Sequence, residues 1–171
     1  RRIATHHKIE DAGHDQWFLQ DIAFITQKPH DISWLFGKEN ELVRFFSYDI
    51  LSEVLKISSD YLRVILILTL ESTGHIFFEN MANFVNSHGY ESHLKYFSSY
   101  HLEVEHNHAI FEEQLNQEIF KIKLSSEDRS QAIDLVDRVY QGFNKVFDYL
   151  NTSLTEKYLP EDKNEQEHLV A

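Results

Sequence analysis

The sequence predicts an all-α protein, and two observations support this prediction. Among 171 residues there are only 5 Gly and 2 Pro, so few positions oppose a helix. Long stretches place apolar residues three and four positions apart, which is the period of an amphipathic helix. At this length we expect one domain with a sizeable core, residues 1–159, followed by a charged tail at residues 160–171.

Three helices are expected in the first third of the chain. Residues 1–27 should form the first, which the Lys28-Pro29 pair ends because a residue before proline disfavours helical backbone. A short helix is expected at residues 32–36, capped by Asp31, and a third should follow the capping residue Asn40 and run to about residue 56. The side chains of the third helix that should face inward are Leu42, Phe45, Phe46, Ile50 and Leu51.

Four further helices are expected in the rest of the chain. A long one should span residues 58–86, and its first half is apolar on nearly all sides, which indicates burial. A short helix at residues 92–97 should precede a longer one that contains His101 and reaches Lys123. The last should run from about residue 125 to residue 158 and contribute packing rather than chemistry.

Composition excludes several classes of function. The formal net charge is −12, and nucleic acids and anionic membranes both require a basic face, so we expect neither as a partner. The absence of cysteine excludes disulfides and thiolate nucleophiles. The longest apolar run, residues 64–68, is too short to span a bilayer, and the cytoplasm is the default location. Because the chain opens inside a predicted helix, we expect a segment before residue 1.

The most informative stretch is residues 101–108, HLEVEHNH. In a helix, Glu105 lies about 40° from His101, and His108 about 20° on the other side. Two imidazoles and a carboxylate therefore project from one stripe. These are the ligand types that iron, manganese and zinc bind in proteins.

The first predicted helix carries a second set of such residues. His7 and His14 are seven residues apart, and Glu10, Asp11 and Asp21 lie at helical spacing on the same face. That face can be an ordinary solvated stripe, which is the usual meaning of charged residues on a helix. Two histidines among acids, beside two aromatic residues, make a ligand set an equally good interpretation.

Glu71 directly follows the most apolar stretch of the chain. A buried carboxylate is costly unless it is paired, protonated or bound to a metal ion. A structural ion pair with a basic residue of a neighbouring helix is the alternative. Three separate helices thus offer inward-facing ligands, as in the helical bundles that hold two metal ions between facing helices.

At this point the sequence resembles the heme-oxygenase-like diiron oxidases and oxygenases. This family includes the chlamydial death-domain-associated protein and alkene synthases that decarboxylate fatty acids. Its members carry Glu and His on a first ligand helix, a lone Glu on a middle helix and His-x3-Asp-x2-His on a later one. The resemblance implies that His14, Glu71 and the His101, Glu105 and His108 triplet bind metal. It covers about residues 5–110.

Two positions depart from the family pattern. Glu105 stands where Asp is usual, so its longer side chain should reach the metal ions differently. His7 occupies the place where several members carry Glu. Glu10 could replace that carboxylate from one turn away, or His7 could bind instead. We rank Glu10 slightly ahead of His7 because two divalent ions require anionic charge.

By this resemblance we expect a heme-oxygenase-like helical bundle whose first helix precedes residue 1. Its function would be that of an oxidoreductase with two iron ions, or an Fe/Mn pair, that uses O₂ to oxidise a small organic substrate. A homodimer is expected from the habit of the family. One alternative is a metal-free hydrolase or ligand-binding module of the same fold, similar to thiaminase II, although that branch normally uses a cysteine. The other alternative is a non-enzymatic helical interaction protein.

Overall fold

The computed structural model describes residues 2–28, 33, 36–107, 117 and 119–158, and its regular elements in these ranges are all helices. The prediction of an all-α protein is therefore confirmed over the described part of the chain. The α-helices are α1 (Arg2–Glu10), α2 (His14–Thr26), α3 (Glu41–Lys56), α4 (Asp60–Ser87), α5 (Ser99–His106) and α7 (Ser126–Tyr158), with a 3-10 turn, η2 (Lys38–Asn40), before α3.

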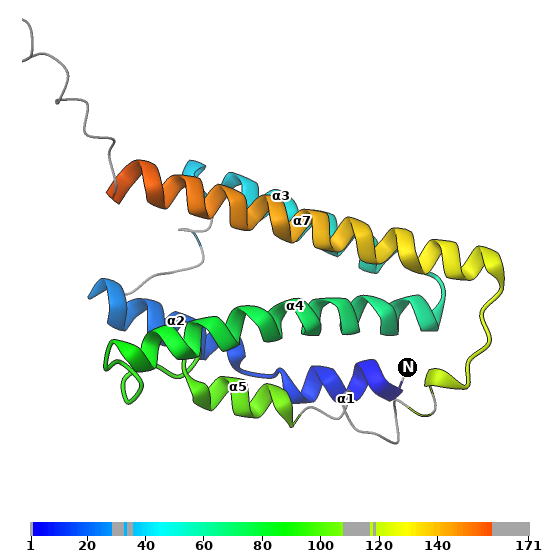
Figure 1. The fold of residues 1–171 in the computed structure, drawn as a ribbon, viewed down its shortest axis with the longest axis horizontal. Helices are drawn as coiled ribbons and strands as arrows, with labels where there is room; N and C mark the ends of the chain where they lie inside the picture. The colour runs from blue at the N-terminus through cyan, green and yellow to red at the C-terminus, as the bar shows by residue number, and fades with distance from the viewer. Residues whose placement is uncertain (1, 29–32, 34–35, 108–116, 118, 159–171) are drawn as a thin grey trace, which may run out of the picture.

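Helix α4 is the central element of the bundle. Helices α3 and α7 lie side by side along one flank of α4, and α1, α2 and α5 lie along the other (Figure 1). Six of the seven predicted ligand residues belong to α1, α2, α4 or α5, and the seventh, His108, lies outside the described residues. The candidate site is therefore expected between α4 and the flank that α1, α2 and α5 form.

Two apolar clusters hold these layers together. On the α7 flank, Leu66 of α4 packs with Leu135 and Val139 of α7, and all three are almost completely buried. On the other flank, Phe18 and Ile22 of α2 pack against the cluster of buried residues Val85, Leu94 and Phe97. The second cluster joins α2 to the end of α4 and to the chain segment that leads into α5.

The predicted single helix at residues 1–27 is wrong, because the chain forms two helices there. Gly13 adopts a φ of 98°, a left-handed conformation that glycine tolerates and that interrupts a right-handed helix. Helix α1 therefore ends at Glu10 and α2 begins at His14. As a result, His7 and His14 do not share one continuous helical face.

The predicted short helix at residues 92–97 is also wrong. The structure has turns there, and the backbone N–H groups of Lys95 and Phe97 donate to the carboxylate of Asp21. A side chain from another helix has thus replaced the hydrogen bonds that a local helix would have made. Sequence periodicity carries no information about such a distant acceptor.

Other predicted elements agree with the structure more closely. The bounds of α3, α4 and α7 match the expectation within two residues. Two side chains of α3 expected to face inward do not, since Phe45 is 56% and Leu51 55% exposed. The predicted helix that reaches Lys123 is present as α5 from Ser99 to His106. Most of residues 32–36, residues 108–116 and the tail at 160–171 lie outside the described residues.

The length of α4 changes one inference about membranes. By length and composition, this 28-residue helix is apolar enough to cross a bilayer. The apolar run at residues 64–68, taken by itself, is too short to do so. The central helix of a bundle can satisfy the same criterion, so the observation is weak evidence for a membrane span. In this structure α4 instead lies between two flanks of the bundle and carries Glu71 at its middle.

Candidate metal centre

Ligand-type side chains from four helices gather into two groups beside α4. Within each group, one nitrogen or oxygen atom of every residue lies within 4.8 Å of the others. We call them the His14 group and the His7 group. The His14 group consists of His14, His101 and Glu105, and the His7 group consists of His7, Asp11 and Glu71.

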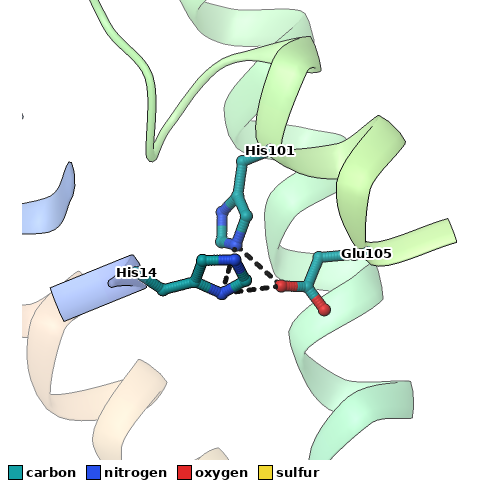
Figure 2. A group of neighbouring side chains, drawn as sticks. All are labelled: His14, His101 and Glu105. Carbon is teal, nitrogen blue, oxygen red and sulfur yellow. Dashed lines mark hydrogen bonds and ion pairs between the residues drawn. The ribbon is translucent and has the colours of Figure 1, made fainter. Parts of the chain in front are cut away.

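The His14 group joins α2 to α5. Glu105 Oε1 lies 2.7 Å from Nε2 of His101 and 3.3 Å from Nδ1 of His14. The two imidazole nitrogens are themselves 3.4 Å apart, so three ligand atoms converge on one point (Figure 2). His101 is only 1% exposed, which places this point inside the bundle rather than on its surface.

The His7 group joins the end of α1 to the middle of α4. Nε2 of His7 lies 3.0 Å from Oδ2 of Asp11 and 3.2 Å from Oε1 of Glu71. The first contact spans four residues at the helix end, and the second crosses between helices. The side chains of His7 and Glu71 are 15% and 11% exposed, so water has little access to their contact.

A pair of carboxyl groups connects the two groups. Glu71 of the His7 group and Glu105 of the His14 group are hydrogen-bonded through their side chains. Burial, followed by the negative charges of Glu105 and Asp11, raises the pKa of Glu71 to about 8. At neutral pH the pair therefore retains a proton when no other cation compensates its charge.

The orientation of His101 can be deduced from its backbone contact. Its Nδ1 lies 2.8 Å from the carbonyl oxygen of Tyr96, and a carbonyl can only accept, so Nδ1 carries the proton and donates. The lone pair of Nε2 in the neutral ring then faces Glu105 at 2.7 Å. Two acceptors at that distance need a cation between them, either a proton or a metal ion.

These observations satisfy the requirements of a site for two cations. Each group offers imidazole nitrogen and carboxylate oxygen, and the Glu71–Glu105 interaction joins a carboxyl of one group to a carboxyl of the other. Histidine ligands normally donate their second ring N–H to a carbonyl or carboxylate, as His101 does. The residues present therefore fit two divalent metal ions of the kind that accept mixed nitrogen and oxygen ligands.

Comparison with protein-family models, curated proteins and solved structures gives no match. The similarity to the heme-oxygenase-like enzymes thus remains an expectation from the sequence. Function has to be inferred from the side chains themselves.

The structure brings together most, but not all, of the predicted ligands. His14, Glu71, His101 and Glu105 take part in the two groups, and so does His7. Glu10, which we ranked slightly ahead of His7, belongs to neither group formed by the described residues, although its charge also raises the pKa of Glu71. His108 lies outside the described residues.

Asp11 is the ligand-type residue that the sequence analysis did not select. It was visible on the polar face of the first predicted helix, one position from Glu10. On a continuous helix neither acid is preferred. Asp11 directly follows α1, its N–H donates to the His7 carbonyl at 3.0 Å, and its carboxylate contacts the ring of His7 one turn away.

Aromatic rings cover the His14 group. Phe78 of α4 and Tyr96 pack on His101 with ring centroids 4.2 and 4.6 Å away. Trp17 packs on both histidines, and the Lys95 ammonium lies 3.9 Å from the centroid of the indole ring. Burial, with the charges of Glu105 and Asp11, raises the pKa of Tyr96 to about 12, so its hydroxyl stays protonated.

A groove in the described part of the chain lies apart from these ligand-type residues. It occupies about 580 Å³ between α3 and α7, and none of the predicted ligands lines it. Its walls include Phe45 and Phe46, and its rim carries the Arg138–Glu53 ion pair. The groove and the two ligand groups are therefore separate features of the bundle.

Proposed function

We propose that this chain is a nonheme dimetal oxidase or oxygenase, with a heme-oxygenase-like bundle that uses O₂ to oxidise a small organic substrate. The single observation that carries this proposal is the meeting of two ligand groups at the Glu71–Glu105 carboxyl pair. Their ligand atoms come from segments far apart in the sequence, and rigid neighbouring helices are what hold two cations close together.

Each ligand group would hold one ion. His14, His101 and Glu105 are assigned to the first ion, and His7, Asp11 and Glu71 to the second. Three carboxylates then offset most of the charge of two divalent ions. The mixture of imidazole and carboxylate favours iron or manganese over magnesium, which prefers oxygen ligands alone. A bound iron pair would supply the electrons that activate O₂.

The residues of the chain prepare this site in three ways. Glu71 and Glu105 would hold cations as ionised carboxylates, so the proton that the pair retains without metal would have to leave. The Tyr96 carbonyl holds His101 with Nε2 directed at Glu105. Phe78 and Trp17 cover the imidazole rings and restrict the access of water, which strengthens electrostatic contacts inside the site.

Metal analysis tests the proposal directly. Untagged protein, purified without chelators, should contain nearly two equivalents of iron or manganese. A Glu71→Gln variant should lose most of one equivalent or more, because it removes one of the two carboxylates of the His7 group. Glu79→Gln is the matched control: Glu79 lies on the same helix but is exposed and belongs to neither ligand group. It should retain the metal content of the wild type.

Oxygen uptake separates a redox enzyme from a passive metal-binding protein. Anaerobic protein loaded with ferrous iron should consume O₂ from solution, and the Glu71→Gln variant should consume much less. Protein that stays metal-free after incubation with ferrous and manganous salts would contradict the proposal and favour a helical interaction protein. Protein that binds two metal ions but consumes no O₂ would contradict the oxidase function alone.

A further inference from the structure

Asp21 is a buried carboxylate that belongs to neither ligand group. It lies on α2 and is 3% exposed. Its Oδ1 accepts the N–H of Lys95, and its Oδ2 accepts those of Lys95 and Phe97, at 2.9 to 3.0 Å. A buried charge is stable only when such hydrogen bonds compensate it. Asp21 therefore fixes the backbone on both sides of Tyr96.

Tyr96, which lies between these two anchored N–H groups, orients His101. The Tyr96 carbonyl accepts the Nδ1 proton of His101 at 2.8 Å, and the Tyr96 ring packs on the imidazole at a centroid distance of 4.6 Å. Because residues 92–97 do not form a helix, no local ladder of hydrogen bonds holds this carbonyl in place. Its direction depends on the contacts that Asp21 makes to its two neighbours.

Asp21 also lies on the same helix as His14. The two residues are seven positions apart, which is two helical turns, so they project from nearly the same face of α2. One end of that face binds the segment before α5 through Asp21, and the other end brings His14 to within 3.4 Å of His101. A shift of α2 against this segment would separate the two imidazoles.

We propose that Asp21 is a positioning residue for the metal centre: it holds the Tyr96 carbonyl on His101 and sets α2 in register with the start of α5. This inference rests on the proposed function, because it assumes that His14 and His101 bind a metal ion. Partners of this kind, which orient a ligating histidine, affect metal affinity about 10- to 100-fold when they are removed.

The first test measures the ring of His101 itself in metal-free protein. In protein with ¹⁵N-labelled histidine, long-range ¹H–¹⁵N correlation spectra distinguish a proton on Nδ1 from one on Nε2. The His101 signals can be assigned by their loss in a His101→Gln variant. In alkaline solution, the wild type should show the Nδ1-protonated tautomer alone, and Asp21→Asn should show a mixture of both.

The second test measures Co²⁺ affinity by competition with a chelator, followed by visible absorption. Asp21→Asn should weaken binding of one Co²⁺ ion about 10- to 100-fold and leave binding at the His7 group nearly unchanged. Tyr61→Phe is the matched control, because it also removes a hydrogen bond between two segments, from Tyr61 to the Asp128 carbonyl, away from both ligand groups. Its Co²⁺ affinity should stay within about 2-fold of wild type.

The outcomes are distinguishable. If Asp21→Asn binds Co²⁺ as tightly as the wild type, the positioning role is wrong and the proposed function stands. If the wild type binds no Co²⁺, the proposed function fails and the positioning role fails with it. If Asp21→Asn does not fold, the spectrum of the wild type still decides, because a proton on Nε2 of His101 contradicts the inference.

Discussion

Glu71 makes the stability of the metal-free protein depend on pH. Its pKa is raised to about 8 in the folded chain, mainly by burial and by the charge of Glu105, whereas a carboxyl in an unfolded chain has its ordinary value of 4.5. Between these values the folded state keeps a proton that the unfolded state releases. The contribution of Glu71 to the free energy of unfolding should therefore be fully present below pH 4.5, the pKa in the unfolded chain, and be lost as pH rises toward about 8, the pKa in the folded chain.

The expected slope can be derived from this difference. One proton held only by the folded state changes the free energy of unfolding by at most about 1.4 kcal/mol per pH unit. We take roughly half of that limit, since solvent screens a site that is not completely closed. From about pH 5.5 to about pH 7.5, the metal-free protein should thus lose about 1 to 2 kcal/mol through Glu71.

Urea unfolding of chelator-treated protein at both pH values measures this loss. Other groups titrate in the same range, so the informative quantity is the difference between the wild type and Glu71→Gln. Over this pH interval the free energy of unfolding of Glu71→Gln should fall by about 1 to 2 kcal/mol less than that of the wild type. Glu79→Gln should behave like the wild type. Equal slopes in the wild type and Glu71→Gln would refute the assigned proton.

Three further predictions concern packing and metal binding. Leu135→Ala should lower the free energy of unfolding by about 3 kcal/mol because Leu135 is 2% exposed, whereas Leu55→Ala, at a residue 78% exposed, should change it by less than about 0.5 kcal/mol in urea titrations. Gly142→Ala should lower the free energy of unfolding by about 1 to 2 kcal/mol, because the added Cβ would overlap the ring of Phe46. Thermal unfolding should show that adding Phe46→Leu restores part of the lost Tm. Mn²⁺ at 100 times its Kd should stabilise the wild type by about 2.7 kcal/mol, and His101→Ala should abolish most of the resulting rise in Tm.

The sequence alone was sufficient to predict the long helices and most of the residues that gather in the two ligand groups. The apolar period of residues 58–86 and the capping residues before Glu41 and Ser126 gave the bounds of α3, α4 and α7 within two residues. Glu71 was found because a carboxylate beside a strongly apolar run needs a partner, and the structure places it against His7.

The remaining errors have a common physical origin in long-range contacts and local backbone geometry. A pattern of apolar residues cannot show that Asp21 binds the backbone at Lys95 and replaces a short helix. It also cannot show which of Glu10 and Asp11 contacts His7, because both lie about one helical turn from it. The signal that was available but not used was Gly13, a residue that often ends a helix.

That glycine has a consequence for how sequence changes would act on the site. Nothing lies within 4 Å of the position where a Cβ would be, so a larger residue at position 13 would meet no steric obstacle. A residue with a side chain would instead disfavour the left-handed backbone conformation and favour one continuous helix from α1 into α2. In such a continuous helix, His7 and His14 would project from nearly the same face, about 10 Å apart along the axis. The separation of these side chains into two ligand groups therefore depends on the backbone freedom of a single glycine that belongs to neither group.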